Sequence, residues 1–192
     1  MPGAVVTVEA ALFAVTVVAW FLLELRRALH RRTDAATEGD RSSLALLRVT
    51  TPLGFLLAVL VALLVPAAAV PAWLADGVAL LLLWCGIAIR WWSIRALGDY
   101  FTYTVQTSSD QRVVDTGPYR WVRHPAYLGM SLAFLGVACL LANWLSVLVL
   151  APVMLVGVAY RIRVEEAAMT AELGEAYSRF AASRKRLVPG VW

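Results

Sequence analysis

Residues 49–70 read VTTPLGFLLAVLVALLVPAAAV, a run without a single charged side chain. The run is long enough for the roughly 20 residues that an α-helix needs to cross the hydrocarbon core of a bilayer. The whole chain has the same character, since 61% of its 192 residues are hydrophobic and only 16% are charged. A soluble domain of this size cannot cover its surface with so few polar groups. We therefore predict an all-α integral membrane protein.

Four further apolar runs accompany this one, at Val5–Leu25, Trp73–Ile89, Tyr127–Leu141 and Leu145–Tyr160. Together the runs predict about five transmembrane helices. The first run differs from a signal peptide because no basic region precedes it and arginines follow it in place of a small-residue cleavage site. We interpret it as a retained first span.

The arginines indicate which end of each span faces the cytoplasm. The loop between the first two predicted spans contains Arg26, Arg27, Arg31, Arg32, Arg41 and Arg48. The next connection, Pro66–Asp76, contains no basic residue. Because basic loops stay on the cytoplasmic side, we expect the N-terminus on the outer side of the membrane and the C-terminus on the cytoplasmic side. Every remaining basic cluster then faces the cytoplasm.

The overall charge has the same explanation. A net charge of +4 and a pI of about 9.4 fit a membrane topology and anionic lipid headgroups, so we expect no nucleic-acid partner. No feature indicates an obligate protein partner. Cys85 and Cys139 lie in apolar runs without metal-site spacing, and we expect neither a metal nor a disulfide.

The chain divides into two predicted regions. Residues 1–96 form a three-span anchor whose polar residues are almost confined to helix ends, and residues 97–192 form a catalytic region. The latter comprises the 97–124 loop, a helical hairpin made by the last two spans, and an amphipathic C-terminal segment. The hairpin turn is predicted at Leu141–Trp144, and Pro125 suits the first turn of its first helix. Gly174 predicts a break in the C-terminal helix.

The most informative polar spacing is Arg161 and Glu165, four residues apart. On a helix they share one face, and Arg163 and Glu166 are expected to point elsewhere. A surface ion pair is the alternative interpretation of this spacing.

The order of motifs adds a second argument. Gly117-Pro-Tyr119 and Arg123-His-Pro-Ala-Tyr127 precede the hairpin, and Arg161-x-x-x-Glu-Glu166 and Gly174-Glu-x-Tyr177 follow it. This order resembles the isoprenylcysteine carboxyl methyltransferase family, integral membrane enzymes that use S-adenosylmethionine. The resemblance covers about residues 101–189.

The resemblance implies a set of site residues. Those that would line the S-adenosylmethionine site are Gln106, Gln111, Arg112, Val113, Val114, Tyr119, His124, Pro125, Ala126, Tyr127 and Glu165. Arg161 would orient the methyl acceptor, a lipophilic molecule that carries a carboxylate, as isoprenylcysteine does. The cofactor site would lie on the cytoplasmic side, in the loop, the hairpin and the C-terminal helix.

The residue types fit this chemistry. S-adenosylmethionine presents cations, a carboxylate and an adenine, and its pocket needs a carboxylate, basic or amide donors, and aromatic walls. The chain lacks the G-x-G loop of soluble dinucleotide-binding folds. A carboxylate acceptor is already ionised at neutral pH, so no general base is needed. Two alternatives stay open: an NADPH-dependent membrane reductase that uses Arg120, Arg123 and Arg163, and a non-enzymatic membrane protein on the same scaffold.

Overall fold

The computed structural model describes residues 8–30, 40, 42–101 and 112–192. The chain separates into two compact units, Met1–Thr33 and Asp34–Trp192, which we consider separately. The first contains one helix, α1 (Val8–His30), over the first predicted span.

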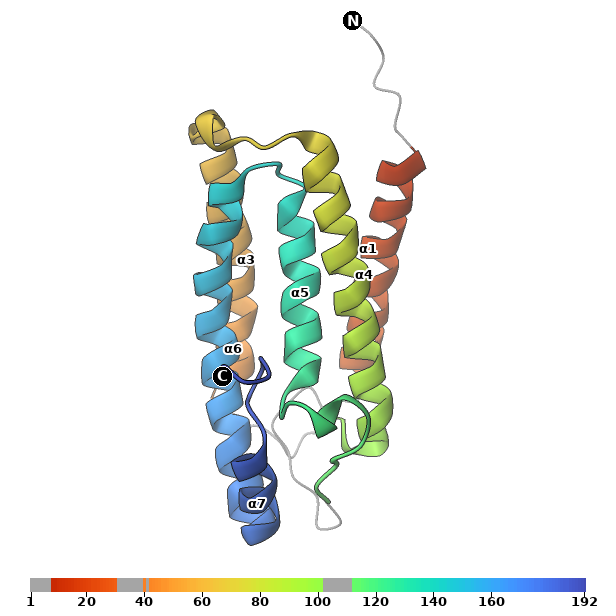
Figure 1. The fold of residues 1–192 in the computed structure, drawn as a ribbon, viewed down its shortest axis with the longest axis vertical. Helices are drawn as coiled ribbons and strands as arrows, with labels where there is room; N and C mark the ends of the chain where they lie inside the picture. Colours follow the sequence, from red (N-terminus) through yellow and green to blue (C-terminus); the bar gives the residue numbers. More distant parts are fainter. Residues whose placement is uncertain (1–7, 31–39, 41, 102–111) are drawn as a thin grey trace, which may run out of the picture. The chain divides into compact units, whose positions relative to one another are not determined.

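The second unit is helical throughout its described part (Figure 1). Its helices are α3 (Ser43–Leu64), α4 (Ala72–Leu97), α5 (Pro125–Cys139), α6 (Trp144–Leu173) and α7 (Glu175–Ser183). Short 3₁₀ turns lie at η2 (Pro66–Ala68), η3 (Gly98–Tyr100) and η4 (Gly117–Arg120). Among the described residues the only β pairings are two isolated bridges, so the all-helical prediction is confirmed.

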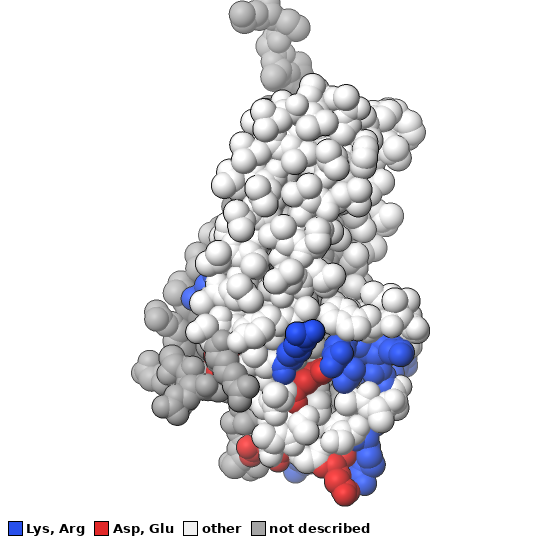
Figure 2. All heavy atoms as spheres, turned by 90° about the vertical axis from the view of Figure 1, so that its left-hand side faces the viewer, with Lys and Arg blue, Asp and Glu red and all other residues white. Residues whose placement is uncertain are grey.

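Among the described residues, three helices are long and apolar enough to cross a membrane. They are Ser43–Leu64, Ala72–Tyr100 and Trp144–Leu173, with mean hydropathies of 2.1, 2.0 and 2.1. Pro125–Cys139 is a shorter apolar helix. Figure 2 shows one face of the protein, on which the charged side chains gather in the lower part of the view while the described upper part is uncharged. The chain is an integral membrane protein, and the number of spans stays a prediction.

Helices α5 and α6 form the predicted hairpin. The Asn143 side chain caps α6 by accepting the N–H of Ser146 at 3.1 Å, and it donates to Val65 O at 3.0 Å. The Ser146 hydroxyl donates to Ala58 O at 2.7 Å, which ties the start of α6 to α3. At the other end of α6, Gly174 has a φ of +53° and separates α6 from α7, as the sequence predicts.

The helices pack in two main pairs, α4 with α5 and α3 with α6, and α5 also contacts α6. In the first pair glycines bring the backbones together. A Cβ added to Gly86 would lie 2.4 Å from Ala133 N, and one added to Gly129 would lie 2.5 Å from Arg90 N. Small residues allow this close approach between membrane helices. Each pair joins a helix of the predicted anchor to one of the catalytic region, and the boundary at residue 96 stays a prediction.

Gly86→Ala should lower the free energy of unfolding by about 1–3 kcal/mol, because the new methyl group meets backbone atoms that cannot rotate away. Gly77→Ala is the matched control in the same helix, since nothing lies within 4 Å of its Cβ position. Both changes gain about the same helix propensity, so their difference isolates the contact. Thermal unfolding in detergent measures it, and equal melting of the two variants would contradict the close packing of α4 on α5.

Candidate functional site

The polar site lies where α5 begins, beside the part of α6 that follows its apolar run. Tyr127, in the first turn of α5, donates its hydroxyl proton to Glu165 Oε2 at 2.6 Å. The same hydroxyl accepts from Arg161 Nε at 3.1 Å. One phenol thus bridges two residues that are one helical turn apart. The prediction that Arg161 and Glu165 share a face is confirmed.

Arg161 is buried, with 3% of its surface exposed. Its Nη1 donates to Ser43 Oγ at 2.7 Å and to Asp40 Oδ1. The other oxygen of Asp40 accepts the N–H of Leu44 at 3.0 Å and so holds the first turn of α3. A buried guanidinium is costly unless a carboxylate neutralises it, and Asp40 supplies that charge. The alternative of a surface ion pair therefore does not describe Arg161.

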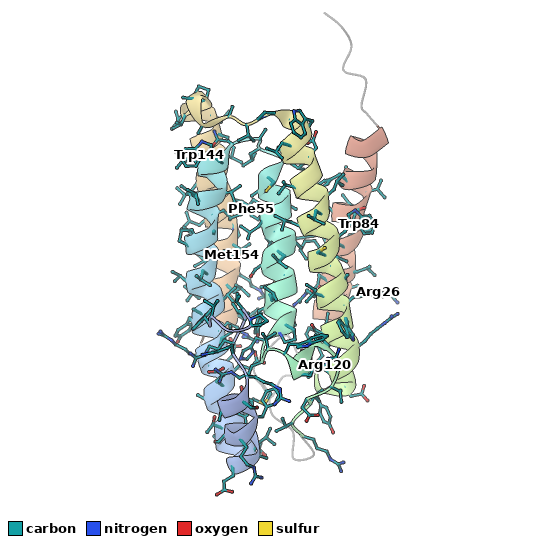
Figure 3. All side chains as sticks on the ribbon, in the orientation of Figure 1. Arg26, Phe55, Trp84, Arg120, Trp144 and Met154 are labelled. Atoms are coloured by element: carbon teal, nitrogen blue, oxygen red, sulfur yellow. The ribbon has the colours of Figure 1, made fainter. Side chains whose placement is uncertain are left out.

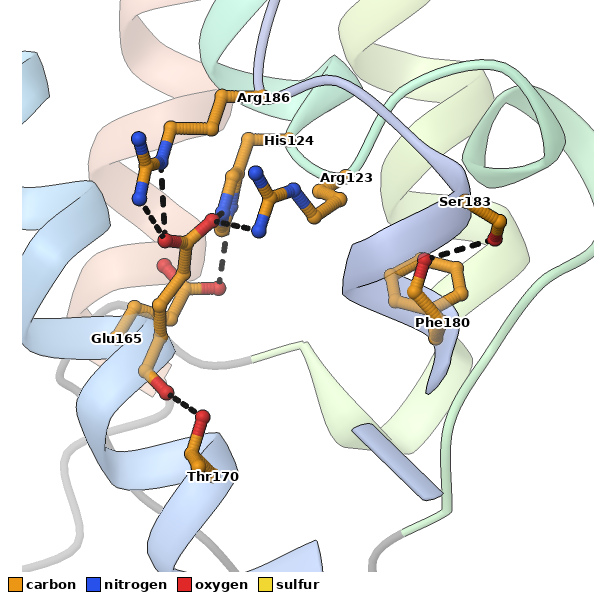
Figure 4. Close-up of polar contacts among 8 residues, drawn as sticks. Arg123, His124, Glu165, Thr170, Phe180, Ser183 and Arg186 are labelled. Carbon is orange, nitrogen blue, oxygen red and sulfur yellow. Dashed lines mark hydrogen bonds and ion pairs between the residues drawn. The ribbon is translucent and has the colours of Figure 1, made fainter. Parts of the chain in front are cut away.

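His124 is buried at the end of the loop that leads into α5 and lies between two carboxylates. Its Nε2 is 3.2 Å from Glu166 Oε1, and its Nδ1 is 3.8 Å from Glu165 Oε1. Arg123 Nη1 also contacts Glu166 Oε1, at 2.9 Å. Figure 4 shows these side chains converging from the loop and from α6. The cluster connects His124 to both acidic residues of the Glu-Glu motif.

The C-terminal tail completes this cluster. Arg186 donates to Glu166 Oε2 from Nε at 2.9 Å and from Nη2 at 2.8 Å, and these hydrogen bonds raise the pKa of Arg186. The tail is held in place because the N–H groups of Arg123 and His124 donate to Lys185 O and Arg186 O, at 2.8 and 2.9 Å. The expectation that Glu166 points away from the site is wrong, because the tail and the loop bring three donors to it.

Arg186→Gln should weaken the hold on Glu166 without abolishing it, since Arg123 and His124 still contact that carboxylate. The Arg186 side chain is 35% exposed, so we expect unfolding free energy to fall by about 0.5–1 kcal/mol. The control is Arg179→Gln, which breaks a surface pair with Glu175 whose side chains are 78% and 92% exposed. Thermal unfolding compares the two. Identical melting temperatures would show that the tail contact contributes nothing.

An aromatic wall adjoins the acidic residues. Tyr119, in η4, packs with Tyr177 and Phe180 of α7, and the partly buried Val113 and Val114 lie against the same cluster. Burial, reinforced by the charge of Glu165, raises the pKa of Tyr119 well above its usual value. The phenol therefore stays neutral at physiological pH and offers an uncharged aromatic surface.

The structure brings most of the predicted site residues together. Those in or beside the cluster are Val113, Val114, Tyr119, His124, Pro125, Ala126, Tyr127, Arg161 and Glu165. Arg112 is exposed, while Gln106 and Gln111 lie outside the described residues.

Five residues of the site were not predicted from the sequence. Asp40, Ser43 and Glu166 contact predicted residues directly, and Arg186 does so through Glu166. The fifth, Arg90 of α4, is buried and donates to Ala126 O at 3.3 Å. The sequence does indicate that Arg90 and Arg161 have polar partners, because an arginine in an apolar helix requires one.

Comparison with known proteins assigns the chain to a family. A sequence model of the phospholipid methyltransferase (PEMT) family matches residues 75–176, more than half of the chain. The chain belongs to this family. The matched region includes the loop motif, the helical hairpin and both acidic residues of α6. Arg186 and the tail lie beyond it.

Individual relatives give a more specific comparison. Protein-S-isoprenylcysteine O-methyltransferase of Schizosaccharomyces pombe is 32% identical over 96 residues, which are 49% of this chain and 39% of that protein. The Saccharomyces cerevisiae protein of the same name is 40% identical over 76 residues, 38% of this chain and 32% of its own length. The chain thus spans well under half of these relatives.

A solved structure agrees with these relatives. The eukaryotic intramembrane Ras methyltransferase ICMT (isoprenylcysteine carboxyl methyltransferase) superimposes with a TM-score of 0.61 at 25% identity, covering 77% of this chain and 52% of that one. The relationship to isoprenylcysteine carboxyl methyltransferases predicted from the motifs is confirmed.

Proposed function

We propose that the chain is an S-adenosylmethionine-dependent methyltransferase that acts on a lipophilic, carboxylate-bearing acceptor at the membrane. The observation that carries the proposal is the Tyr127 hydroxyl between Arg161 and Glu165, in the region that matches the family. It holds a cationic and an anionic side chain side by side at the end of an apolar helix. Such a pair can receive an anionic acceptor next to a cationic cofactor.

The residues fit the cofactor. The Glu165 side chain is 26% exposed, so its carboxylate is open to a cationic group, and Tyr119 provides an aromatic wall. Arg123 Nε is a buried donor without an acceptor among the described residues, which suits a ligand that carries a carboxylate. Glu165, Tyr119 and Arg123 would therefore hold the cofactor, together with the loop residues that the family resemblance implies.

When bound, S-adenosylmethionine supplies an electrophilic methyl group on a sulfonium. The protein then has to place an acceptor oxygen in line with that methyl group and keep water out. An ionised acceptor carboxylate needs no general base, and the positive charge of the Arg161 guanidinium can orient it. Tyr127 fixes the guanidinium at Nε, and the buried His124 lies beside Glu165, with Nδ1 3.8 Å from Oε1.

The contacts favour methyl transfer over a reductase. A nicotinamide cofactor with a 2′-phosphate needs a cluster of uncompensated cations, whereas Glu166 already compensates the charge of Arg123, the arginine next to His124. Titration of the purified protein with S-adenosylhomocysteine and with NADPH separates the possibilities. We expect binding of the first alone. Binding of NADPH alone would support the reductase, and binding of neither would support a non-enzymatic protein.

The proposal includes a topology with five spans, the N-terminus outside and the site on the cytoplasmic side, in the inner or plasma membrane. A reporter fused after Trp192 should then report the cytoplasm, and one fused before Val5 should report the outside, because the basic residues follow this pattern. Both reporters on the same side of the membrane would contradict an odd number of spans.

A further inference from the structure

A second polar surface lies at the end of α4, where η4 packs on it. Arg95 Cζ is 4.1 Å from the ring centroid of Trp91, and Arg120 Cζ is 3.9 Å from that of Trp121. Both arginines are exposed. Trp91, Trp92 and Trp121 are themselves 43%, 46% and 46% exposed. We call these five residues the tryptophan–arginine surface.

The five residues form one continuous surface. The rings of Trp92 and Trp121 meet edge to face, with centroids 5.5 Å apart and an interplanar angle of 74°. With 3.6 residues per turn, Arg95 lies angularly between Trp91 and Trp92, one turn further along α4. Gly117 of η4 sits directly on α4, since a Cβ there would lie 3.2 Å from Trp92 Nε1. In Figure 3, Arg120 lies beside this end of α4.

The two guanidinium groups keep their charge available to a ligand. Neither Arg95 nor Arg120 forms an ion pair with a carboxylate of the described residues, in contrast to Arg123, Arg161 and Arg186. A guanidinium stacked on an indole still directs its N–H groups outward, in the plane of the fork. Two such forks on one surface suit a phosphate group.

The position along α4 indicates the source of that phosphate. Trp91, Trp92 and Arg95 lie in the last turns of the apolar helix Ala72–Tyr100. This is the depth at which tryptophans contact the headgroup region of a bilayer. Exposed indoles beside the arginines offer an apolar surface to the glycerol and acyl chains of a lipid. Inorganic phosphate has no such apolar part to contact the indoles.

We propose that the tryptophan–arginine surface binds the headgroup of an anionic phospholipid. The guanidinium groups of Arg95 and Arg120 would hold the phosphodiester, and the indole rings would contact the lipid beside it. A net anionic headgroup is favoured over a zwitterionic one, because two uncompensated cations repel a choline group. None of its five residues is among those proposed for methyl transfer, so its test does not depend on catalysis.

Native mass spectrometry of the full chain in detergent tests the proposal, with phosphatidylglycerol and phosphatidylcholine as probes. The wild type should retain phosphatidylglycerol in preference. Arg95→Gln combined with Arg120→Gln should weaken phosphatidylglycerol binding about 25-fold, at about fivefold for each cation. The control, Arg163→Gln combined with Arg179→Gln, removes the same charge from exposed positions on α6 and α7 and should stay within about twofold of wild type.

Each other outcome would overturn the proposal. Equal losses in the two double variants would show that overall charge, not this surface, attracts the lipid. Unchanged binding in the Arg95 and Arg120 variant would place the lipid elsewhere. A third arm adds inorganic phosphate: displacement of the lipid by equimolar phosphate would show that the indoles contribute nothing and that the surface is a phosphate site, not a lipid site.

Discussion

Glu165→Gln should reduce affinity for S-adenosylmethionine by about 10- to 150-fold, which corresponds to about 1.5–3 kcal/mol for a lost charge-assisted contact. The substitution keeps an oxygen that can accept from the Tyr127 hydroxyl, so the bridge to Arg161 can persist while the negative charge disappears. Because the Glu165 side chain is partly exposed, the protein should remain folded in detergent. Calorimetric titration with S-adenosylmethionine, alongside thermal unfolding, provides the measurement.

Two comparisons sharpen this test. Glu175→Gln removes a carboxylate that is almost fully exposed and, within the described part of the chain, pairs only with Arg179 at 3.7 Å, so cofactor affinity should not change. Tyr127→Phe removes the bridging hydroxyl but keeps the ring, and should weaken binding less than Glu165→Gln does. Wild-type affinity in Glu165→Gln would remove this carboxylate from the cofactor site.

Arg161→Lys should lower methyl-transfer efficiency by at least about tenfold while S-adenosylmethionine affinity stays near that of the wild type. Lysine keeps the charge but cannot reproduce the planar fork that orients a carboxylate. Arg161→Ala should be worse, because it also leaves Asp40 buried without its partner. Breaking a buried pair in this way costs about 3–5 kcal/mol of stability.

The contact between Asp40 and Arg161 determines how this experiment is designed. Loss of activity in Arg161→Ala can result from unfolding, so the double variant Asp40→Asn, Arg161→Gln removes both charges together. It should fold more stably than Arg161→Ala and still lack turnover. Asp40→Asn alone should retain turnover, since it leaves the guanidinium in contact with Tyr127 and Ser43.

Kinetics with a prenylated thiol acid as surrogate acceptor, together with cofactor titrations, decide the role of Arg161. Full activity in the double variant would show that the arginine serves only to neutralise Asp40. A loss of cofactor affinity as large as the loss of turnover would show that Arg161 acts on the cofactor and not on the acceptor.

Much of the fold follows from local features of the chain. The apolar runs predict the helices, Pro125 begins α5, the hairpin turn falls close to its expected position, and Gly174 ends α6. The four-residue spacing places Arg161 and Glu165 on one face, and the motif order predicts the family. These features depend on hydrogen bonds and periodicities within one helix or turn, so neighbouring residues are enough to specify them.

Other features of the site come from residues far apart in the sequence. Asp40 and Arg161 are 121 positions apart, and His124 and Glu166 are 42 apart. No local pattern pairs them. Asp40 meets Arg161 because α3 packs on α6, and His124 meets Glu166 because α5 contacts α6. The tail lies along the loop before α5 and carries Arg186 to Glu166. Helical periodicity determines the direction in which a side chain leaves its own helix. The partner of that side chain depends on which helices pack together and how closely they approach. Contacts such as those of Gly86 and Gly129 set this approach.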